Sequence, residues 1–298
     1  MRRPDILCIG SVLWDIIGRT GVSMRARGDV AGHITRMPGG VALNIAMTVA
    51  RFGLRPALLS VVGTDAEGNA LVEACAALGL ETGFLHRDPA LPTDRYMAIE
   101  DETSLVAAIA DAHSLEAAGE AILTPLVDGR LGSASAPWAG PVALDGNLTE
   151  ALLAQIAASP LFAAADLRIA PASPGKAERL LPLLPHPNSV LYVNLQEAGL
   201  LLDASFASSR DAAEALVAAG ASRALVTDGA RDASDATRGA ETLTQPSRRV
   251  QARRITGAGD TFMAAHLFAE TRGAPRAEAL TRAQAAAAAY VAFEDPTP

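Results

Sequence analysis

The sequence has few of the residues and runs that mark disulfide-rich, metal-binding or membrane-spanning proteins. It contains two cysteines, Cys8 and Cys75, and no C-x-x-C or H-E-x-x-H pattern. Neither a disulfide framework nor a zinc site is expected, and both thiols are predicted to be buried and reduced. The longest apolar stretch, residues 285–293, is well short of the roughly 20 residues that a membrane span needs. The N-terminal apolar run breaks at Ser11, too early for a signal peptide, so a cytoplasmic location is expected.

Aromatic and basic residues are also scarce. Aromatic side chains make up 4% of the chain, which favours helix-rich α/β packing over an all-β sandwich. The formal net charge is -8, whereas nucleic acids and anionic membranes bind basic surfaces, so neither is expected as a partner. A phosphate-bearing substrate stays compatible with this charge, because a local site can be positive. Residues 231–254 are rich in charge and turns, and exposed loops and edge strands are predicted there.

Short apolar runs alternate with helical patterns along the chain. The runs predicted as strands are 6–10, 57–62, 142–145, 167–170, 190–194 and 224–227. The segments predicted as helices are 41–52, 66–78, 149–157, 175–184 and 211–219. This alternation is typical of βαβ units and predicts a mostly parallel sheet covered by helices on both faces. The whole chain, residues 1–298, is expected to form a single α/β domain.

Two stretches depart from this alternation. Residues 16–38 and 92–112 are strand-like and contain no helical segment between their apolar runs, and 93–100 with 104–110 predicts a hairpin. The two insertions are expected to pair into a small second sheet that forms a lid over the active site. The alternative is a pair of surface hairpins with no role in binding.

A helix is predicted from Ala258 to about Glu270, and small residues and a carboxylate stand at its start, in Thr256-Gly257-Ala258-Gly259-Asp260. The first amides of a helix have no partner within it, and the helix dipole makes that end positive. Small residues let a ligand approach these amides closely, which favours an anion hole. Asp260 is predicted to act there as a general base; as an N-terminal cap it would only complete the helix.

Other polar residues follow predicted strands, where ligands bind in open α/β sheets. Asp15 comes soon after the first strand and suits a pair of sugar hydroxyls. Gly39 and Gly40 lead into a helix that carries Asn44, so amides and this side chain can meet a polar ligand. Three further residues lie at strand ends and are candidates for binding Mg²⁺ or a nucleotide: Asn194, Glu197 and Thr227, the last followed by Gly229.

Taken in this order, the motifs resemble those of the PfkB, or ribokinase-like, family of carbohydrate kinases. The resemblance extends over nearly the whole chain. The segments that carry it are Gly10-Ser11 with Asp15, Gly39-Gly40 with Asn44, Gly63-Thr64-Asp65 with Gly68, Asn194 with Glu197, and Gly257-Ala258-Gly259-Asp260. It implies a ribokinase-like three-layer α/β/α sandwich with a small β-sheet lid, and an ATP-dependent kinase of a sugar or nucleoside.

The resemblance also implies a role for each motif. Asp260 would deprotonate the acceptor hydroxyl, within an anion hole formed by Gly257, Ala258 and Gly259. The residues implied for the acceptor are Asp15, Gly39, Gly40 and Asn44. Those implied for the nucleotide and its Mg²⁺ are Asn194, Glu197, Thr227, Gly229 and Thr256. Many relatives also use a monovalent cation near the anion hole, so K⁺ is a further expected cofactor.

Within the family, several segments resemble those of pseudouridine kinases. These segments are Thr93-Asp94-Arg95-Tyr96, residues 105–111, residues 144–148 and residues 171–177. In this comparison Thr93, Tyr96 and Asp111 face the nucleoside from the lid, and the acceptor is the 5′-hydroxyl of pseudouridine. A ribokinase- or fructokinase-type sugar kinase is the alternative enzyme, and a sugar or nucleoside sensor is the non-catalytic one.

Three positions depart from the family pattern. Arg254, two residues before Thr256, stands where relatives usually carry an acidic residue or asparagine, which bears on the K⁺ site. Asp232 replaces the last glycine of the nucleotide loop, and the methionine that often follows Asp111 is absent.

A dinucleotide-dependent oxidoreductase is excluded because no glycine cluster follows the first strand. The open edges of the predicted lid favour a homodimer.

Overall fold

The computed structural model describes residues 3–24, 28–102, 105–251, 254 and 256–297. Its centre is an eight-stranded sheet in the order β14-β13-β12-β11-β10-β9-β1-β4, counted over these residues. The strands are β1 (Ile6–Ile9), β4 (Pro56–Leu59), β9 (Pro141–Asp145), β10 (Asp166–Ala170), β11 (Ser189–Asn194), β12 (Arg223–Thr227), β13 (Ala233–Thr237) and β14 (Leu243–Gln245). The first six run parallel, and β13 and β14 add antiparallel strands at one edge.

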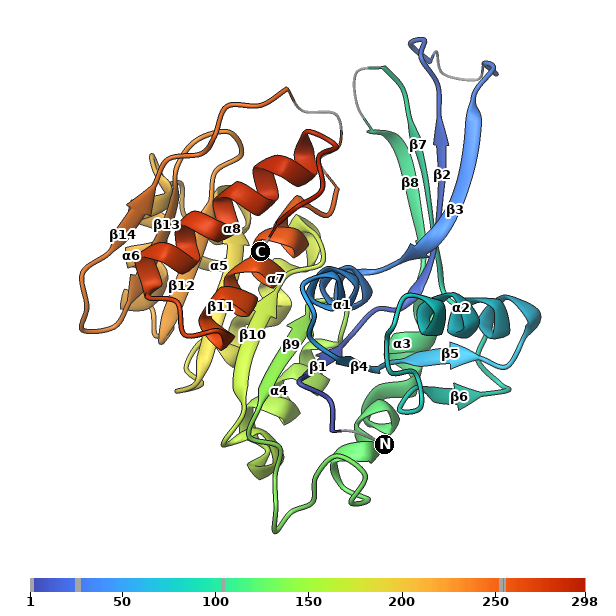
Figure 1. Ribbon diagram of the computed structural model, residues 1–298, viewed down its shortest axis with the longest axis horizontal. Helices are drawn as coiled ribbons and strands as arrows, with labels where there is room; N and C mark the ends of the chain where they lie inside the picture. The colour runs from blue at the N-terminus through green and yellow to red at the C-terminus, as the bar shows by residue number, and fades with distance from the viewer. Residues whose placement is uncertain (1–2, 25–27, 103–104, 252–253, 255, 298) are drawn as a thin grey trace.

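Helices cover both faces of this sheet, as the figure shows (Figure 1). Alternate residues of β1 point to opposite faces, so Ile6 and Cys8 join one apolar cluster while Leu7 and Ile9 join the other. The first cluster includes α1 (Val41–Arg51), α2 (Ala66–Ala77), α7 (Ala258–Thr271) and α8 (Arg276–Val291). The second includes α3 (His113–Ala118), η1 (Gly119–Leu126), α4 (Glu150–Ala158), η2 (Pro160–Phe162), η3 (Pro174–Leu183), α5 (Leu195–Leu202) and α6 (Ser209–Ala218). The predicted three-layer α/β/α architecture is confirmed.

A second sheet of four strands projects from the body (Figure 1). Its order is β3 (His33–Gly39), β2 (Leu13–Arg19), β7 (Arg95–Glu100) and β8 (Leu105–Asp111). The two insertions noted in the sequence therefore do pair with each other, through the parallel contact of β2 with β7. Residue 104, at the start of the second predicted hairpin strand, lies outside the described residues. A further pair, β5 (Val61–Gly63) and β6 (His86–Asp88), lies beside α2.

Two predicted elements differ from those observed. The run 57–62 is divided at Ser60, because β4 stays in the central sheet while β5 leaves it to pair with β6. The segment 175–184 forms 3₁₀ turns, in η3, instead of an α-helix. Pro182 lies inside it and has no amide hydrogen to donate, which breaks the regular α-helical bonding.

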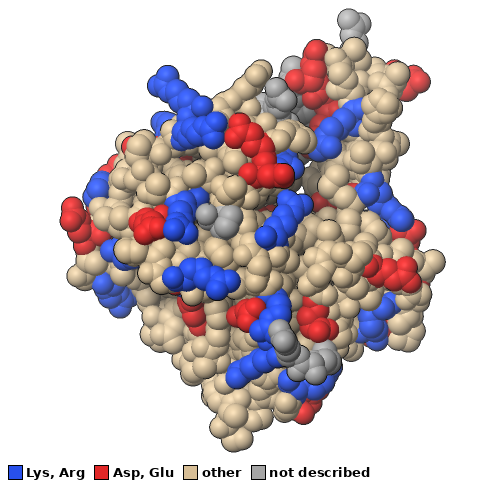
Figure 2. All heavy atoms as spheres, viewed as in Figure 1, with Lys and Arg blue, Asp and Glu red and all other residues tan. Residues whose placement is uncertain are grey.

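Both cysteines are buried and unpaired, as predicted. Burial raises the pKa of the Cys75 thiol to about 12 and also raises that of Cys8. Within the described ranges, none of the helices combines the length and the apolar character needed to cross a bilayer. On the face shown in Figure 2, basic and acidic side chains are interspersed over the body and the second sheet.

Candidate active site

Several of the residues singled out in the sequence lie at the carboxyl ends of the parallel strands. Asn194 ends β11 and Thr227 ends β12, and the two are direct neighbours in the sheet register. Further along the same sheet, β1 pairs with β9. The chain leaves β1 and enters β2, which carries Asp15. This edge of an open parallel sheet is where ligands bind, because the loops and helix starts converge there.

The first turn of α7 lies at this edge and is shaped by glycine. Gly257 caps the helix with a φ of 89°, and a Cβ there would lie 2.5 Å from the hydroxyl of Tyr290. That hydroxyl donates to the carbonyl of Thr256 at 2.9 Å, which fixes the residue before the turn. A Cβ at Gly259 would meet no atom within 4 Å, so this glycine borders open space. The amides of the first turn can therefore receive an anion without a side chain in the way.

Asp260 stands in that turn and is tied to the acceptor side of the site. Asn44 Nδ2 donates to its Oδ2 at 2.9 Å, across 216 positions of the sequence. Burial raises the pKa of Asp260 to about 7; the bond from Asn44 acts against this rise, and the negative charges of Asp145, Asp15 and Glu197 add to it. A carboxylate with a pKa near neutrality is suited to accept a proton during a reaction.

The glycine pair before α1 is required by close contacts. A Cβ at Gly39 would lie 2.0 Å from Oδ2 of Asp15, so only glycine leaves room for this carboxylate. Gly40 has a φ of 102°, and a Cβ there would lie 2.5 Å from the carbonyl oxygen of Ser11. Burial raises the pKa of Asp15 to about 6. Asp15, Gly39, Gly40 and Asn44, the residues expected to bind the acceptor, thus lie together along one wall of the candidate site, here called the acceptor wall.

Asp145, at the end of β9, is an important residue that the sequence reasoning did not single out. It is fully buried and accepts hydrogen bonds from the amides of Ser11, Ala42 and Asn147 at 2.7 to 3.0 Å, and from the Ser11 hydroxyl at 2.9 Å. Burial raises its pKa in spite of these donors. Gly10 has no room for a side chain here, since a Cβ would lie 2.3 Å from the carboxylate. Asp145 therefore joins the ends of β1 and β9 to the start of α1.

A polar chain runs outward from this carboxylate. Ser11 accepts a bond from Asn147 Nδ2 at 2.9 Å, and Lys176 Nζ donates to Asn147 Oδ1 at 2.8 Å. Lys176 is partly buried, which lowers its pKa, with the nearby Arg179 acting in the same direction. The only sequence signal for Asn147 and Lys176 was that they lie in segments resembling pseudouridine kinases.

The three residues expected to face a nucleoside from the second sheet are placed differently. Tyr96 lies opposite Asp15 in the β2–β7 register and shares its face. Asp111 lies on the other face, where it pairs with Arg95 at 3.9 Å. Thr93 is buried, and its hydroxyl donates to Asp65, the cap of α2, at 2.6 Å. Only Tyr96 of the three is brought together with Asp15.

On the nucleotide side, Asn194 and Glu197 cap α5. Each side chain accepts a bond from the other's amide, at 2.8 and 2.9 Å. Burial raises the pKa of Glu197. Among the described residues there is no cluster of three or more metal-ligating side chains, so a cation here would keep several waters, as Mg²⁺ does. The amide and carboxylate oxygens of this pair fit such a water-mediated site. Gly229, with a φ of 56°, turns the chain after Thr227.

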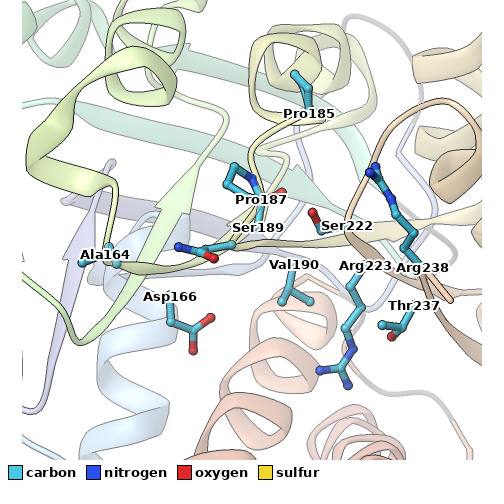
Figure 3. A pocket seen from close by; sticks show the side chains of 12 residues that line it. Ala164, Asp166, Pro185, Pro187, Ser189, Val190, Ser222, Arg223, Thr237 and Arg238 are labelled. Atoms are coloured by element: carbon cyan, nitrogen blue, oxygen red, sulfur yellow. The ribbon is translucent and has the colours of Figure 1, made fainter. Parts of the chain in front are cut away.

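A groove of about 740 Å³ lies elsewhere, at the amino ends of β10, β11 and β12 (Figure 3). Asp166, Ser189 and Arg223 line it, each at the start of its strand. Arg223 is held by Asp235 at 2.7 Å and by Glu270 of α7 at 2.7 Å. The groove is at the sheet edge opposite to Asn194 and Thr227, so it is separate from the candidate active site.

Residues 3–296 match the family described as pfkB family carbohydrate kinase. The chain belongs to this family. The family resemblance inferred from the sequence motifs is therefore confirmed.

Individual relatives cover different parts of the chain. The bifunctional protein HldE of Rhodopseudomonas palustris (strain BisA53) is 28% identical over 296 residues, which is 96% of this chain and 60% of HldE. The chain thus spans only 60% of that relative. The pseudouridine kinase of Escherichia coli (strain K12) is 33% identical over 104 residues, 35% of this chain and 33% of that enzyme.

Solved structures show the same fold. Arabidopsis thaliana ribokinase complexed with ribose and ATP aligns with a TM-score of 0.78 and 20% identity, over 97% of this chain and 93% of that one. At this identity the likeness confirms the ribokinase-like fold, and the chemistry has to be argued from the site itself.

Proposed function

We propose that the protein is an ATP-dependent kinase that phosphorylates a hydroxyl of a sugar or nucleoside, with the 5′-hydroxyl of pseudouridine as the leading acceptor. The contact between Asn44 and Asp260 carries the proposal, because it joins the acceptor wall to the carboxylate at the start of α7. Asp15 is near enough to Asp260 for its negative charge to raise the pKa of Asp260. A hydroxyl held between these two carboxylates would be next to the amides that receive a phosphoryl group.

In the proposed reaction Asp260 accepts the proton of the acceptor hydroxyl. The hydroxyl oxygen forms a bond to the γ-phosphorus of ATP, and the bond from that phosphorus to the β,γ-bridging oxygen breaks, releasing ADP. The amides at the start of α7 would stabilise the negative charge of the transferring group. The pKa of about 7 for Asp260 keeps it ionised above neutrality and basic enough to accept a proton.

Asn194, Thr227, Gly229 and Thr256 are proposed to border the nucleotide, and Glu197 to orient waters of a Mg²⁺ ion. The ion would neutralise phosphate charge when bound. The four-stranded second sheet is proposed as the lid. Its face with Asp15 and Tyr96 would cover the acceptor and exclude water, which would otherwise accept the phosphoryl group.

The choice of pseudouridine is supported by the partial match to a pseudouridine kinase and by Tyr96, an aromatic side chain on the acceptor face. A free sugar is the second candidate, supported by the paired acids Asp15 and Asp260, which suit any set of vicinal hydroxyls. The two candidate acceptors differ in that pseudouridine carries a nucleobase, which the site would also have to bind, and a free sugar does not.

The first test offers pseudouridine, uridine, ribose, fructose and adenosine separately, each with ATP and Mg²⁺, and measures ADP release. We expect pseudouridine to give the highest kcat/KM, because Tyr96 adds contacts that a free sugar cannot make. The Tyr96→Ala variant should then lose selectivity for pseudouridine over ribose by roughly 10-fold, the scale of one lost aromatic contact. Turnover of ribose or fructose with no turnover of pseudouridine would contradict the acceptor assignment and leave the kinase assignment standing.

We also propose that the chain forms a homodimer through the second sheet. Both β3 and β8 are edge strands of this sheet, and edge strands favour pairing with another chain. The face opposite Asp15 exposes large apolar side chains: Ile34 at 79%, Ile109 at 63% and Met97 at 46% exposure. The register places Met97 beside Ile109, so these side chains form one apolar face that a second copy would cover.

The dimer is tested by measuring the mass in solution with light scattering. The wild-type protein is expected at twice the monomer mass of 30.7 kDa. Ile109→Glu should shift it to the monomer, because a buried unpaired carboxylate at an interface is strongly unfavourable. Val127→Glu, at a 56% exposed position outside this sheet, is the matched control and should remain dimeric. A monomeric wild-type protein would refute the proposal.

A further inference from the structure

Arg254 lies two residues before Thr256 and bonds to the carboxyl end of α8. Its amide donates to the carbonyl of Val291 at 3.3 Å, and its Nε donates to the carbonyl of Tyr290 at 2.7 Å. The end of a helix carries partial negative charge, and a guanidinium is permanently positive. The side chain therefore fixes a positive charge at this point, a few residues before Asp260 in the chain.

Two aromatic rings enclose the guanidinium. Its Cζ lies 3.5 Å from the ring centroid of Tyr290 and 4.7 Å from that of Phe293. A cation over an aromatic face is attracted by the ring electrons. Tyr290 also donates its hydroxyl to the carbonyl of Thr256 at 2.9 Å, directly before Gly257. Arg254, Tyr290 and Thr256 thus form one connected unit that supports the first turn of α7.

The K⁺ ion implied by the family resemblance does not fit these residues. A monovalent cation needs a ring of oxygen ligands, whereas a guanidinium offers only hydrogen-bond donors. The carbonyl of Tyr290 already accepts from Arg254 Nε. A second positive charge next to the guanidinium would be repelled. No step of the proposed reaction is therefore assigned to K⁺.

We infer that Arg254 supplies the fixed positive charge beside the anion hole in place of a bound monovalent cation, so that phosphoryl transfer by this protein does not require K⁺. The inference rests on the proposed kinase function. Arg254 acts through Tyr290 and Thr256 on the start of α7, so it is a positioning residue. Its charge is carried by the chain itself and does not depend on the salt in solution.

The experiment compares KCl with tetramethylammonium chloride at equal ionic strength, using the full chain. The wild-type protein should give the same kcat/KM in both salts and the same melting temperature. Arg254→Ala should lose about 10-fold or more in kcat/KM in tetramethylammonium chloride, since anion-hole geometry is worth at least that much. Added guanidinium chloride should restore part of this activity. Arg254→Asn should become dependent on K⁺, because an amide oxygen is a cation ligand.

Arg248→Ala is the control, because Arg248 is also an arginine near the end of α8 and pairs with the exposed Glu294, at 3.3 Å. It should retain wild-type kinetics in both salts. Strong activation of the wild-type protein by K⁺, or wild-type activity of Arg254→Ala without K⁺, would overturn the inference while leaving the kinase function intact. If no acceptor is phosphorylated in either salt, the proposed function fails. The melting temperature then decides the inference, since stabilisation by K⁺ and not by tetramethylammonium would refute it.

Discussion

Replacing Asp260 with asparagine is expected to lower kcat by roughly 10²–10⁴-fold, the range for the loss of a general base. Asparagine has nearly the same shape and can still accept the bond that Asn44 Nδ2 donates to Oδ2 at 2.9 Å. The backbone of the first turn of α7 should not change. The substitution therefore removes the basicity of residue 260 and keeps its position, so KM for the acceptor should stay close to the wild-type value.

The pH dependence gives a second measurement of the same residue. With a pKa raised to about 7, Asp260 is protonated below neutrality in the folded protein. Wild-type kcat/KM should rise about 10-fold per pH unit below that pKa and level off above it. In Asp260→Asn this rise of kcat/KM with pH, the acidic limb of the profile, should be absent. A wild-type profile that is flat between acid and neutral pH would place the base elsewhere.

Stability should change in the opposite direction to activity. The folded protein binds the Asp260 proton more tightly than the unfolded chain, in which the ordinary value of 3.8 applies. Ionisation of this residue therefore costs stability, and the cost grows as the pH rises from about 4 to about 7 and is complete above that range. Asp260→Asn carries no charge, so it should melt at the same or a higher temperature than wild type at pH 8. A loss of activity with unchanged or higher stability would separate a catalytic role from a structural one.

Asn44→Ala is the matched comparison, since Asn44 contacts the same carboxylate. Its bond lowers the pKa of Asp260, so removing it should move the limb to higher pH without abolishing turnover. A non-catalytic sugar or nucleoside sensor makes a different prediction. It would bind the acceptor with unchanged affinity in wild type and in Asp260→Asn, and neither protein would release ADP.

Much of the fold could be predicted because its signals are local. The strands β1 and β9 are short apolar runs, α1 and α7 follow a glycine, and α2, α4, α5 and α6 follow a side chain that caps the helix. The division of 57–62 at Ser60 has no local signal, because both halves are apolar and fully buried. Which sheet each half joins depends on β6, a partner more than twenty residues away.

The candidate site shows the same division between local and long-range information. Gly39, Gly40 and the Gly257 turn could be predicted, since glycine before a helix marks a special backbone or a close contact. The faces of the second sheet could not, because a strand alternates its side chains and a shift of one residue reverses them. Tyr96 and Asp111 were expected on one face, and the register puts them on opposite faces.

Arg254 and Asp145 show two further limits. The sequence marked Arg254 as a departure from the family pattern, but its stacking on Tyr290 and Phe293 depends on residues near the C-terminal end of the chain. Asp145 gave no signal of its own, as a single acid after a strand is common. Its importance comes from donors at residues 11, 42 and 147, which only the fold brings together.

Asp145→Ala is therefore expected to cause the largest loss of stability among these variants. Removing the carboxylate leaves the amides of Ser11, Ala42 and Asn147 without the acceptor that they have at 2.7 to 3.0 Å. An unsatisfied buried donor costs about 1–3 kcal/mol, and here three amides lose their acceptor together. Part of this loss is offset, because burial raises the pKa of Asp145 and so its ionised form is itself costly. The net decrease in the free energy of unfolding should be roughly 3 kcal/mol or more, a large fraction of the 5–15 kcal/mol typical of a domain.

Urea unfolding followed by circular dichroism measures this decrease, with Asp128→Ala as the control. Asp128 is exposed, and among the described residues its carboxylate bonds to Arg130 in its own turn, so its removal should leave the unfolding midpoint unchanged. Asp145→Asn separates charge from hydrogen bonding. Its amide has one acceptor oxygen, and its NH₂ group would face donors, so it should recover only part of the loss.

If Asp145→Ala unfolds at the wild-type midpoint, the three amides must find other acceptors. The hydrogen bonds of Asp145 to β1, β9 and α1 are then not what holds the acceptor wall in place. If the loss is as large as expected, Ser11 and the start of α1 should be displaced with it. Acceptor KM should then rise in any Asp145 variant that still folds, while the pH limb set by Asp260 persists.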